Sequence, residues 1–282
     1  MRLAQFQEGS ASEFENAIAQ LRKKVGGELS GLVIDLRNNP GGLLTEAIRV
    51  SDIFLKDGII VYTDGRLDSQ KSKYFAHDDG DEPQFPIVML VNGGSASASE
   101  IMSGAFQDHK RAIVLGTQTF GKGSVQTVLP VDNGGAIRLT TALYYTMKGR
   151  SIQAQGIKPD IEVEQDEELI ETKIVRKRKF DPIITERNLR HVIKNAKGEK
   201  EVKVEEPKPG TIGAIKTAEE ETNKPDLSPG SRAALEAKIG DLLKADRQLS
   251  EGLKILKSWD KFKDMTELRV EDLTAKKDEP KS

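Results

Sequence analysis

Residues 86–100 read PIVMLVNGGSASASE, a continuous apolar run followed by small and polar residues. An apolar run of this kind is typical of a parallel strand that is buried on both faces of a sheet. After the small-residue stretch, the sequence predicts a helix that continues to about His109. Ligands of parallel α/β sheets bind beyond the carboxyl ends of the strands, so the loop between this strand and this helix is a candidate site.

The same order of strand, loop and helix recurs on both sides of this stretch. Residues 31–42, GLVIDLRNNPGG, are an apolar run that ends in a polar, glycine-rich loop, and a third apolar run covers 111–115. The remaining predicted elements are two helices, at 11–25 and 43–55, and a strand pair, at 125–131 and 136–145. Alternation of strands and helices predicts an α/β fold with right-handed crossovers.

The composition excludes several kinds of chemistry. The 282 residues include no cysteine, which rules out disulfides, cysteine catalysis and thiolate metal sites. The three histidines, His77, His109 and His191, are too far apart in sequence to form a local ligand motif, and we predict neither a metal site nor a cofactor. A net charge of −2 gives no sign of nucleic-acid binding. No apolar stretch reaches the ~18 residues of a membrane span, and the first ten residues lack the apolar core of an export signal.

Charge divides the chain near residue 164. Charged side chains make up 37 of the first 164 residues and 51 of the remaining 118. We predict a globular core at 1–164 and a partly disordered, partly helical extension beyond it, whose middle has too few apolar residues to offset chain entropy. The predicted parts of the extension are a charged helical or extended segment at 165–195, a disordered linker at 196–230, an amphipathic helix at 231–258 and a charged tail at 259–282.

The third strand leads into a lysine-bearing loop, Gly116 followed by TQTFGKGS at 117–124. It is close to the phosphate-binding pattern G-x-x-x-x-G-K-[ST], but Gly123 takes the place of the hydroxyl residue and a strand rather than a helix follows, so nucleotide binding is not favoured. Lys122, between two glycines, can approach a buried site, where loss of solvent favours the neutral amine. Such an amine can take the proton of a serine hydroxyl, and with no cysteine and no convincing histidine a Ser–Lys pair is the acyl-transfer chemistry that the sequence best supports.

Together the three loops resemble the signatures of the carboxyl-terminal processing peptidases, the tail-specific serine peptidases of the S41 family. The matching stretches are DLRNNPGG at 35–42, SASASEI at 95–101, FGKGSVQ at 120–126 and, closing the core, RSIQ at 150–153 with GIKPD at 156–160. The resemblance covers residues 1–164, with the motifs in the family's order and at its spacing. It implies the ClpP/crotonase-like α/β core of that family.

The resemblance places the nucleophile at Ser97 and the general base at Lys122, with Gln126 orienting the lysine through a hydrogen bond. The two other serines of the SASAS motif are expected to form a turn and a helix cap. Glu100 is expected to complement the dipole of the following helix. Asp108 also falls on a family position and is expected to be structural.

An oxyanion hole is likewise implied, made by the backbone N–H of Ala98 and by that of Gly41 or Gly42. The implied activity is that of a serine endopeptidase, without metal or cofactor, which cleaves polypeptides near their C-terminus and prefers small or apolar tails. Two other readings stay open. One is a non-catalytic peptide-binding or assembly fragment, which would form a homo-oligomer or bind a regulatory partner through the C-terminal helix. The other is a crotonase-like acyl-transfer enzyme.

Members of this family usually carry an export signal or membrane anchor and a PDZ domain that captures the substrate tail. The resemblance therefore implies a periplasmic or membrane-associated protein. These segments are not recognised in the sequence, which opens at Arg2 with what resembles the first core strand after the PDZ domain. We accordingly expect the chain to be a fragment or a truncated product of such a peptidase.

Overall fold

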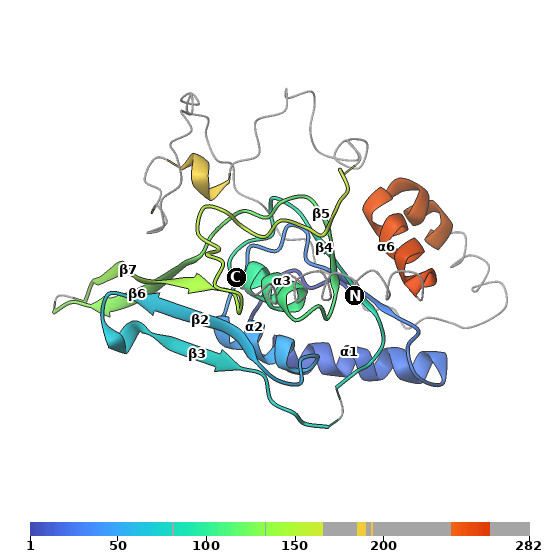
Figure 1. Cartoon of the computed structure of the whole chain (residues 1–282), viewed down its shortest axis with the longest axis horizontal. Helices are drawn as coiled ribbons and strands as arrows, with labels where there is room; N and C mark the ends of the chain where they lie inside the picture. Colours follow the sequence, from blue (N-terminus) through green and yellow to red (C-terminus); the bar gives the residue numbers. More distant parts are fainter. Residues whose placement is uncertain (81, 133, 166–184, 190–192, 194–237, 260–282) are drawn as a thin grey trace, which may run out of the picture.

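The computed structural model describes residues 1–80, 82–132, 134–165, 185–189, 193 and 238–259. The helices are α1 (Ser10–Val25), α2 (Leu44–Asp52), α3 (Ala98–Asp108) and α6 (Arg247–Lys257), with short 3-10 turns η1 (Asp68–Gln70) and η2 (Glu186–Asn188). The strands are β1 (Leu32–Asp35), β2 (Ile59–Gly65), β3 (Ser72–Phe75), β4 (Ile87–Val91), β5 (Ile113–Gly116), β6 (Ser124–Pro130), β7 (Ala136–Tyr145) and β8 (Ile161–Glu162). The mixed α/β class predicted from the sequence is confirmed (Figure 1).

One sheet is parallel and has the strand order β1-β4-β5-β8. Its first three strands are the three apolar runs of the sequence. Because successive side chains of a strand point to opposite faces, the runs supply two layers of core. Ile34 lies opposite Met89 in register, and both belong to the apolar cluster that includes α1, α2 and α3. Val88 and Leu90 face the other way, into the cluster that includes α6. Burial on both faces explains why these strands are apolar throughout.

Helix α3 occupies the centre of the molecule (Figure 1). Ala98, Met102 and Phe106 belong to the cluster beneath the parallel sheet. Ile101 and Ala105 belong to a second cluster, which lies against the other sheet. The helix therefore contacts both sheets, and its N-terminus is held between them at the carboxyl end of β4.

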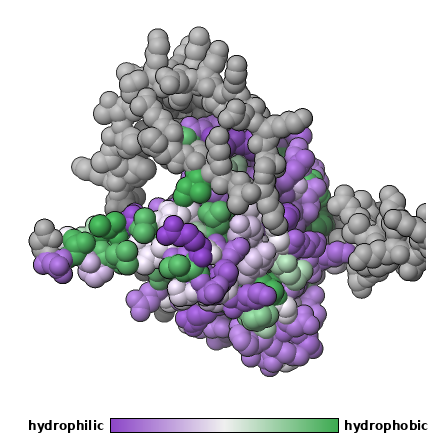
Figure 2. All heavy atoms as spheres, turned by 60° about the vertical axis from the view of Figure 1, so that its left-hand side comes forward, coloured by the Kyte–Doolittle hydropathy of each residue, from purple (hydrophilic) through white to green (hydrophobic). Residues whose placement is uncertain are grey.

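The second sheet is antiparallel, with the strand order β3-β2-β7-β6. The strand pair expected at 125–131 and 136–145 is present as β6 and β7, whereas the β2–β3 pair was not predicted. β3, SKYF, is short and largely exposed, so it lacks the apolar alternation that marks a half-buried strand. The outer half of the β6–β7 hairpin carries an exposed apolar patch (Figure 2), made of Val128, Leu129, Val131, Ile137 and Leu139.

Beyond the core, the described residues include helical residues at 238–245 and helix α6, separated by Asp246. The helix expected over 231–258 is thus interrupted at Asp246, which has an extended backbone and caps α6 by accepting a hydrogen bond from the Leu249 N–H at 3.0 Å. Most of the segments predicted at 165–195, 196–230 and 259–282 lie outside the described residues, so that division of the chain stays a prediction. Among the helices that are described, none is long and apolar enough to cross a membrane.

Phe54 offers a test of the core beneath the parallel sheet. Its ring is 2% exposed and meets the rings of Phe14, Phe85 and Phe106 edge-on, at centroid distances of 5.9, 6.3 and 5.6 Å. Phe54→Ala removes all three contacts and leaves a cavity, so we expect the free energy of unfolding to fall by about 3–5 kcal/mol. Urea titration followed by circular dichroism measures this. The control is Phe75→Ala, whose ring is 48% exposed and whose loss is expected to cost less than ~0.5 kcal/mol. Equal losses in the two variants would contradict the assignment of the core.

Candidate functional site

Three loops meet at the carboxyl ends of neighbouring parallel strands, where the sequence places the candidate site. The loops after β1 and β4 are joined by the Ala96 N–H, which donates to the Asn39 carbonyl at 2.9 Å. The loops after β4 and β5 are joined by the Phe120 N–H, which donates to the Ser95 carbonyl at 3.0 Å. Ser95 is fully buried, and its hydroxyl donates to the Leu36 carbonyl at 2.8 Å. Ser95 is therefore the turn residue that fixes the three loops relative to one another.

Ser97 stands at the point where the loop after β4 turns into α3. Its backbone has φ 55° and ψ −112°, a left-handed conformation that L residues rarely adopt. Such a residue costs of order 1–3 kcal/mol and persists only where surrounding contacts hold it. The sharp turn leaves the Ser97 side chain partly exposed, and among the described residues nothing accepts a hydrogen bond from the N–H of the next residue, Ala98. A free N–H beside a presented hydroxyl can stabilise a negative oxygen there.

The glycine pair of the first loop lies directly against this turn. A Cβ at Gly41 would come within 2.8 Å of Ser97 Cβ and 2.9 Å of the Ala98 nitrogen, so only glycine fits. The N–H of Gly41 donates to Asn39 Oδ1 at 2.9 Å, whereas that of Gly42 meets no acceptor among the described residues. Of the two donors left open by the sequence, Gly42 is thus the one whose N–H is available, and Gly41 is the residue whose small size allows the close approach.

Glu100 joins the Ser97 turn to the lysine loop. Its Oε2 atom accepts hydrogen bonds from the backbone N–H of Ser97 at 2.8 Å and from that of Lys122 at 2.9 Å. Its Oε1 atom accepts from the Gly121 N–H at 2.7 Å and from the Thr119 hydroxyl. Because Oε2 is shared, the backbone nitrogens of Ser97 and Lys122 lie within about 6 Å of each other at hydrogen-bond distances. The structure therefore brings the two predicted residues together.

Two opposing effects act on the pKa of the Glu100 carboxyl. The side chain is fully buried, and burial raises the pKa of the carboxyl to about 7, although the four hydrogen bonds from Thr119, Gly121, Ser97 and Lys122 favour the charged form. All four partners are donors. Their hydrogen bonds limit the rise of the pKa but do not cancel the effect of burial, so the folded protein still favours the protonated acid more than water does.

Lys122 and Gln126 are four positions apart in the sequence but differ in burial. Lys122 is half-buried between Gly121 and Gly123, and among the described residues no carboxylate forms an ion pair with its ammonium. Gln126 lies on β6, next to a break in the register with β7, and its side chain is exposed. The role of Gln126 in orienting the lysine stays a prediction.

Two acidic residues lie at opposite ends of α3, Glu100 on its first turn and Asp108 at its last residue. Asp108, expected to be structural, is buried and accepts hydrogen bonds from the Lys148 N–H and from Arg150. For Glu100, the spacing S-x-x-E from Ser97 is the pattern of a capping box, which predicts its bond to the Ser97 N–H. No local pattern indicates its bonds to the lysine loop, 22 positions further on. Over the part of the chain that is described, no cluster of three or more His, Asp or Glu side chains could hold a metal ion.

Known proteins are similar to the core of this chain. The model of peptidase family S41 matches residues 1–163. The carboxy-terminal-processing protease of Bartonella bacilliformis is 54% identical over 166 residues, which are 58% of this chain and 38% of that protein. The carboxyl-terminal-processing protease of a Synechocystis strain is 42% identical over 165 residues, again 58% of this chain and 38% of that protein. The chain thus spans about two fifths of the length of these curated relatives.

A solved structure shows the same core. The photosystem II D1 C-terminal processing protease superposes with a TM-score of 0.52 at 36% sequence identity, over 58% of this chain and 41% of that one. The matched share agrees with that of the sequence relatives. The fold expected from the three loop motifs is therefore confirmed for the core.

The pH dependence of stability tests the buried state of Glu100. With its pKa raised to about 7, the folded protein holds a proton that the unfolded chain, whose glutamate pKa is about 4.3, has already released. The unfolding free energy is therefore expected to fall by about 2 kcal/mol between pH 5 and pH 8 through this group. Glu100→Gln should lack this decrease, whatever its stability at pH 5.

Urea titrations at four or five pH values between 5 and 8 measure the slope. The exposed carboxyl of Glu164 provides the control, since Glu164→Gln should retain the slope of the wild type. A Glu100→Gln protein with the same slope as the wild type would show that Glu100 is not the group responsible.

Proposed function

The chain belongs to peptidase family S41, whose model matches residues 1–163, and on this premise we propose that it is a serine peptidase with Ser97 as nucleophile and Lys122 as general base. The observation that carries the proposal is the shared oxygen of Glu100, which binds the backbone N–H of both residues. A nucleophile and its base must lie close together, and this contact holds their backbones in that relation. The strained turn at Ser97 is a second support, because it presents the hydroxyl beside the N–H of Ala98, which has no acceptor among the residues that the structure describes.

In the proposed reaction, the neutral amine of Lys122 takes the proton of the Ser97 hydroxyl as Oγ attacks the scissile carbonyl. The carbonyl oxygen becomes negative and is stabilised by the N–H of Ala98 and that of Gly42. Lys122 then passes the proton to the leaving amine, which departs and leaves an acyl-enzyme. A water molecule, deprotonated by Lys122, attacks the ester; the bond to Ser97 Oγ breaks, Oγ takes the proton back from Lys122, and the new C-terminus is released. Each hole donor is typically worth about 3 kcal/mol of transition-state stabilisation.

The proposed substrate is a polypeptide that is cleaved near its C-terminus, with small or apolar residues at the tail. The names of the two similar proteases and of the similar structure describe C-terminal processing. The exposed apolar patch of the β6–β7 hairpin is continuous with the strand that follows Lys122 and offers contact to an apolar tail. The periplasmic or membrane-associated location implied by the resemblance stays a prediction.

The alternative function, that of a non-catalytic assembly fragment, depends on the C-terminal helix as a binding surface. If the chain were a non-catalytic assembly fragment, the C-terminal helix would be the surface offered to a partner. The apolar side of α6 is instead covered by the chain's own parallel sheet, with Ile255 only 5% exposed.

The proposal predicts that Ser97→Ala and Lys122→Ala each abolish cleavage of an unstructured polypeptide with an apolar C-terminus. Ser97→Ala removes the attacking oxygen, and Lys122→Ala removes its base, so kcat/KM should fall by at least ~10³-fold in each variant. Covalent labelling by a fluorophosphonate, which reacts with activated serines, should disappear in parallel. This second measurement does not depend on the choice of substrate.

Ser72→Ala and Lys158→Ala serve as controls, because both side chains are exposed and lie outside the three loops. They should cleave and label as the wild type does. Retention of cleavage in Lys122→Ala would exclude the lysine as base, and labelling of Ser97→Ala would identify a different serine as nucleophile.

The fit of Gly41 against the turn predicts a separate effect. In Gly41→Ala the added methyl would lie 2.7 Å from the Ala96 carbonyl oxygen and 2.8 Å from Ser97 Cβ, which must push the first loop away from the nucleophile. We expect kcat to fall by roughly 100-fold or more, as when an oxyanion donor is lost, with KM nearly unchanged. Steady-state kinetics on a variant shown to be folded by circular dichroism measure this. A folded Gly41→Ala protein with wild-type kcat would place the oxyanion hole elsewhere.

A further inference from the structure

Helix α6 lies on the face of the parallel sheet opposite to α1, α2 and α3 (Figure 1). Ile255 packs in the cluster that contains Val88 and Leu90 of the central strand β4. Gly252 faces the same strand, and a Cβ there would lie 3.2 Å from Val88 Cγ1, so the missing side chain lets the helix approach closely. Helix α6 thus covers the second face of the parallel sheet in this chain, although it lies far beyond the residues 1–163 that match the family.

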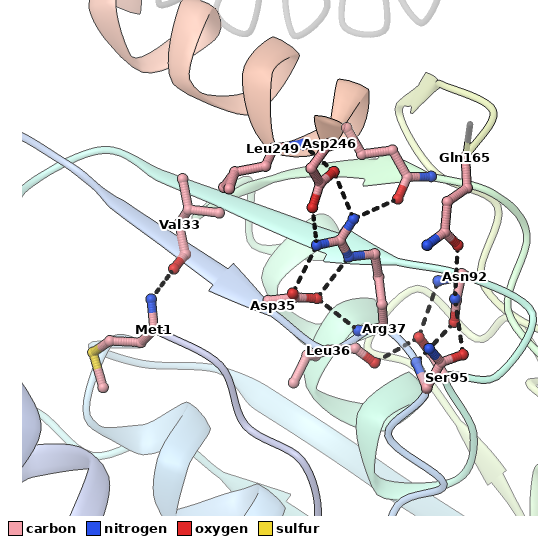
Figure 3. Close-up of polar contacts among 12 residues, drawn as sticks. Met1, Val33, Asp35, Leu36, Arg37, Asn92, Ser95, Gln165, Asp246 and Leu249 are labelled. Carbon is pink, nitrogen blue, oxygen red and sulfur yellow. Dashed lines mark hydrogen bonds and ion pairs between the residues drawn. The ribbon is translucent and has the colours of Figure 1, made fainter. Parts of the chain in front are cut away.

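A polar anchor joins the start of α6 to the first loop of the site (Figure 3). The carboxylate of Asp246 accepts from Nη1 and Nη2 of Arg37, at 2.8 and 2.7 Å. Asp35 accepts from Nε and Nη2 of the same side chain, at 2.9 and 2.8 Å. Gln248 Oε1 accepts from Nη1 at 3.2 Å, while its own amide donates to the Val163 carbonyl at 2.7 Å. A guanidinium has five N–H donors, and all five of Arg37 are therefore engaged, three of them by the α6 end of the chain.

This anchor is shielded from solvent. The side chains of Arg37, Asp35 and Asp246 are 10%, 17% and 15% exposed, and Gln248 is fully buried. Bidentate pairing between a planar guanidinium and a carboxylate fixes geometry as well as distance. The contact therefore holds Arg37 in one orientation as long as α6 is docked.

Arg37 is also the first residue of the loop that reaches Gly42. The next residue, Asn38, has a left-handed backbone, and its N–H donates to Asn92 Oδ1 at 2.9 Å. The Asn92 amide donates back to Asn38 Oδ1 at 3.0 Å. The loop is thus held at Arg37 by α6, at Asn38 by the loop after β4, and at Gly41 by its close fit against Ser97.

We propose that α6 is a positioning element of the active site: Asp246, through Arg37, sets the backbone of residues 38–42 that supplies the glycine side of the oxyanion hole. Asp246 is a positioning residue and touches neither nucleophile nor base. The inference rests on the proposed peptidase function for its catalytic consequence, but its structural part, the order of the 38–42 loop, stands apart from that function.

The sharpest test is Asp246→Asn in the full chain. Asparagine caps helices as well as aspartate does, so α6 should still form. The amide, however, has a single oxygen and turns N–H groups toward the guanidinium, so the bidentate pair with Arg37 is lost. Glu251→Gln is the matched control, because it makes the same change of charge on the same helix, at a side chain that pairs with Lys254 on the helix surface.

Two measurements are made on each protein. Hydrogen exchange, read by mass spectrometry on peptides that cover 37–42, should be at least about tenfold faster in Asp246→Asn than in the wild type, since the loop has lost one of its fixed ends. Steady-state kinetics should show kcat lowered by roughly 10- to 100-fold with KM changed less than about twofold, as expected when reacting groups are misplaced. Glu251→Gln should match the wild type in both measurements.

A cycle with Arg37→Lys tests whether Asp246 acts through Arg37. If it does, Arg37→Lys with Asp246→Asn should lose no more kcat than Arg37→Lys alone. Additive losses in the cycle would overturn the route through Arg37. Unchanged exchange at 37–42 in Asp246→Asn would overturn the positioning role, and faster exchange with unchanged kcat would overturn its catalytic consequence.

Failure of the proposed function is recognised separately. If the wild type neither cleaves an apolar-tailed polypeptide nor reacts with a fluorophosphonate, the peptidase assignment fails. The exchange measurement then still decides whether α6 orders the 38–42 loop.

Discussion

The carboxylate of Glu100 is the contact on which the geometry of the site depends. It is fully buried, yet each of its four partners donates a hydrogen bond to it. Two of these donors are the backbone N–H groups of Ser97 and Lys122, which lie on different loops. A buried acceptor that satisfies several donors at once is costly to lose. Glu100 therefore joins the strained turn at Ser97 to the backbone of the lysine loop.

The fold explains why a single carboxylate can do this. Parallel strands end at the same edge of their sheet, so the loops after β1, β4 and β5 converge there. Helix α3 starts at that edge and is packed on both sides, by the cluster of the parallel sheet and by that of the antiparallel sheet. Its first turn is thereby fixed, and Glu100, on that turn, points into the space between the loops. On the opposite face of the sheet, α6 holds the first loop through Arg37, so the site is supported from both faces of one sheet.

Much of this could be predicted from particular residues. The apolar runs before Asp35, Asn92 and Thr117 identify buried parallel strands, because only strands covered on both faces are apolar throughout. The small residues after them identify loops at one edge. Absence of cysteine and scarcity of histidine leave serine and lysine for acyl transfer, and the motif order indicates the family, which the match over residues 1–163 confirms. The β2–β3 pair was missed; β3 is short and largely exposed, so periodicity carries no signal for that strand.

The sequence by itself determined the class of the fold and the family, because strand burial, turn residues and motif spacing are local properties of the chain. The Ser–Lys chemistry of the three loops stays a prediction from the same motifs. Tertiary structure alone decided that Asn39 engages the N–H of Gly41, whereas that of Gly42 meets no acceptor in the described part of the chain. It alone decided that Glu100 bridges two loops and that Asp246 meets Arg37 across 209 positions. Hydrogen bonds and ion pairs between distant residues leave no periodic trace in a sequence. They exist only once the apolar layers have folded and brought their donors and acceptors within reach.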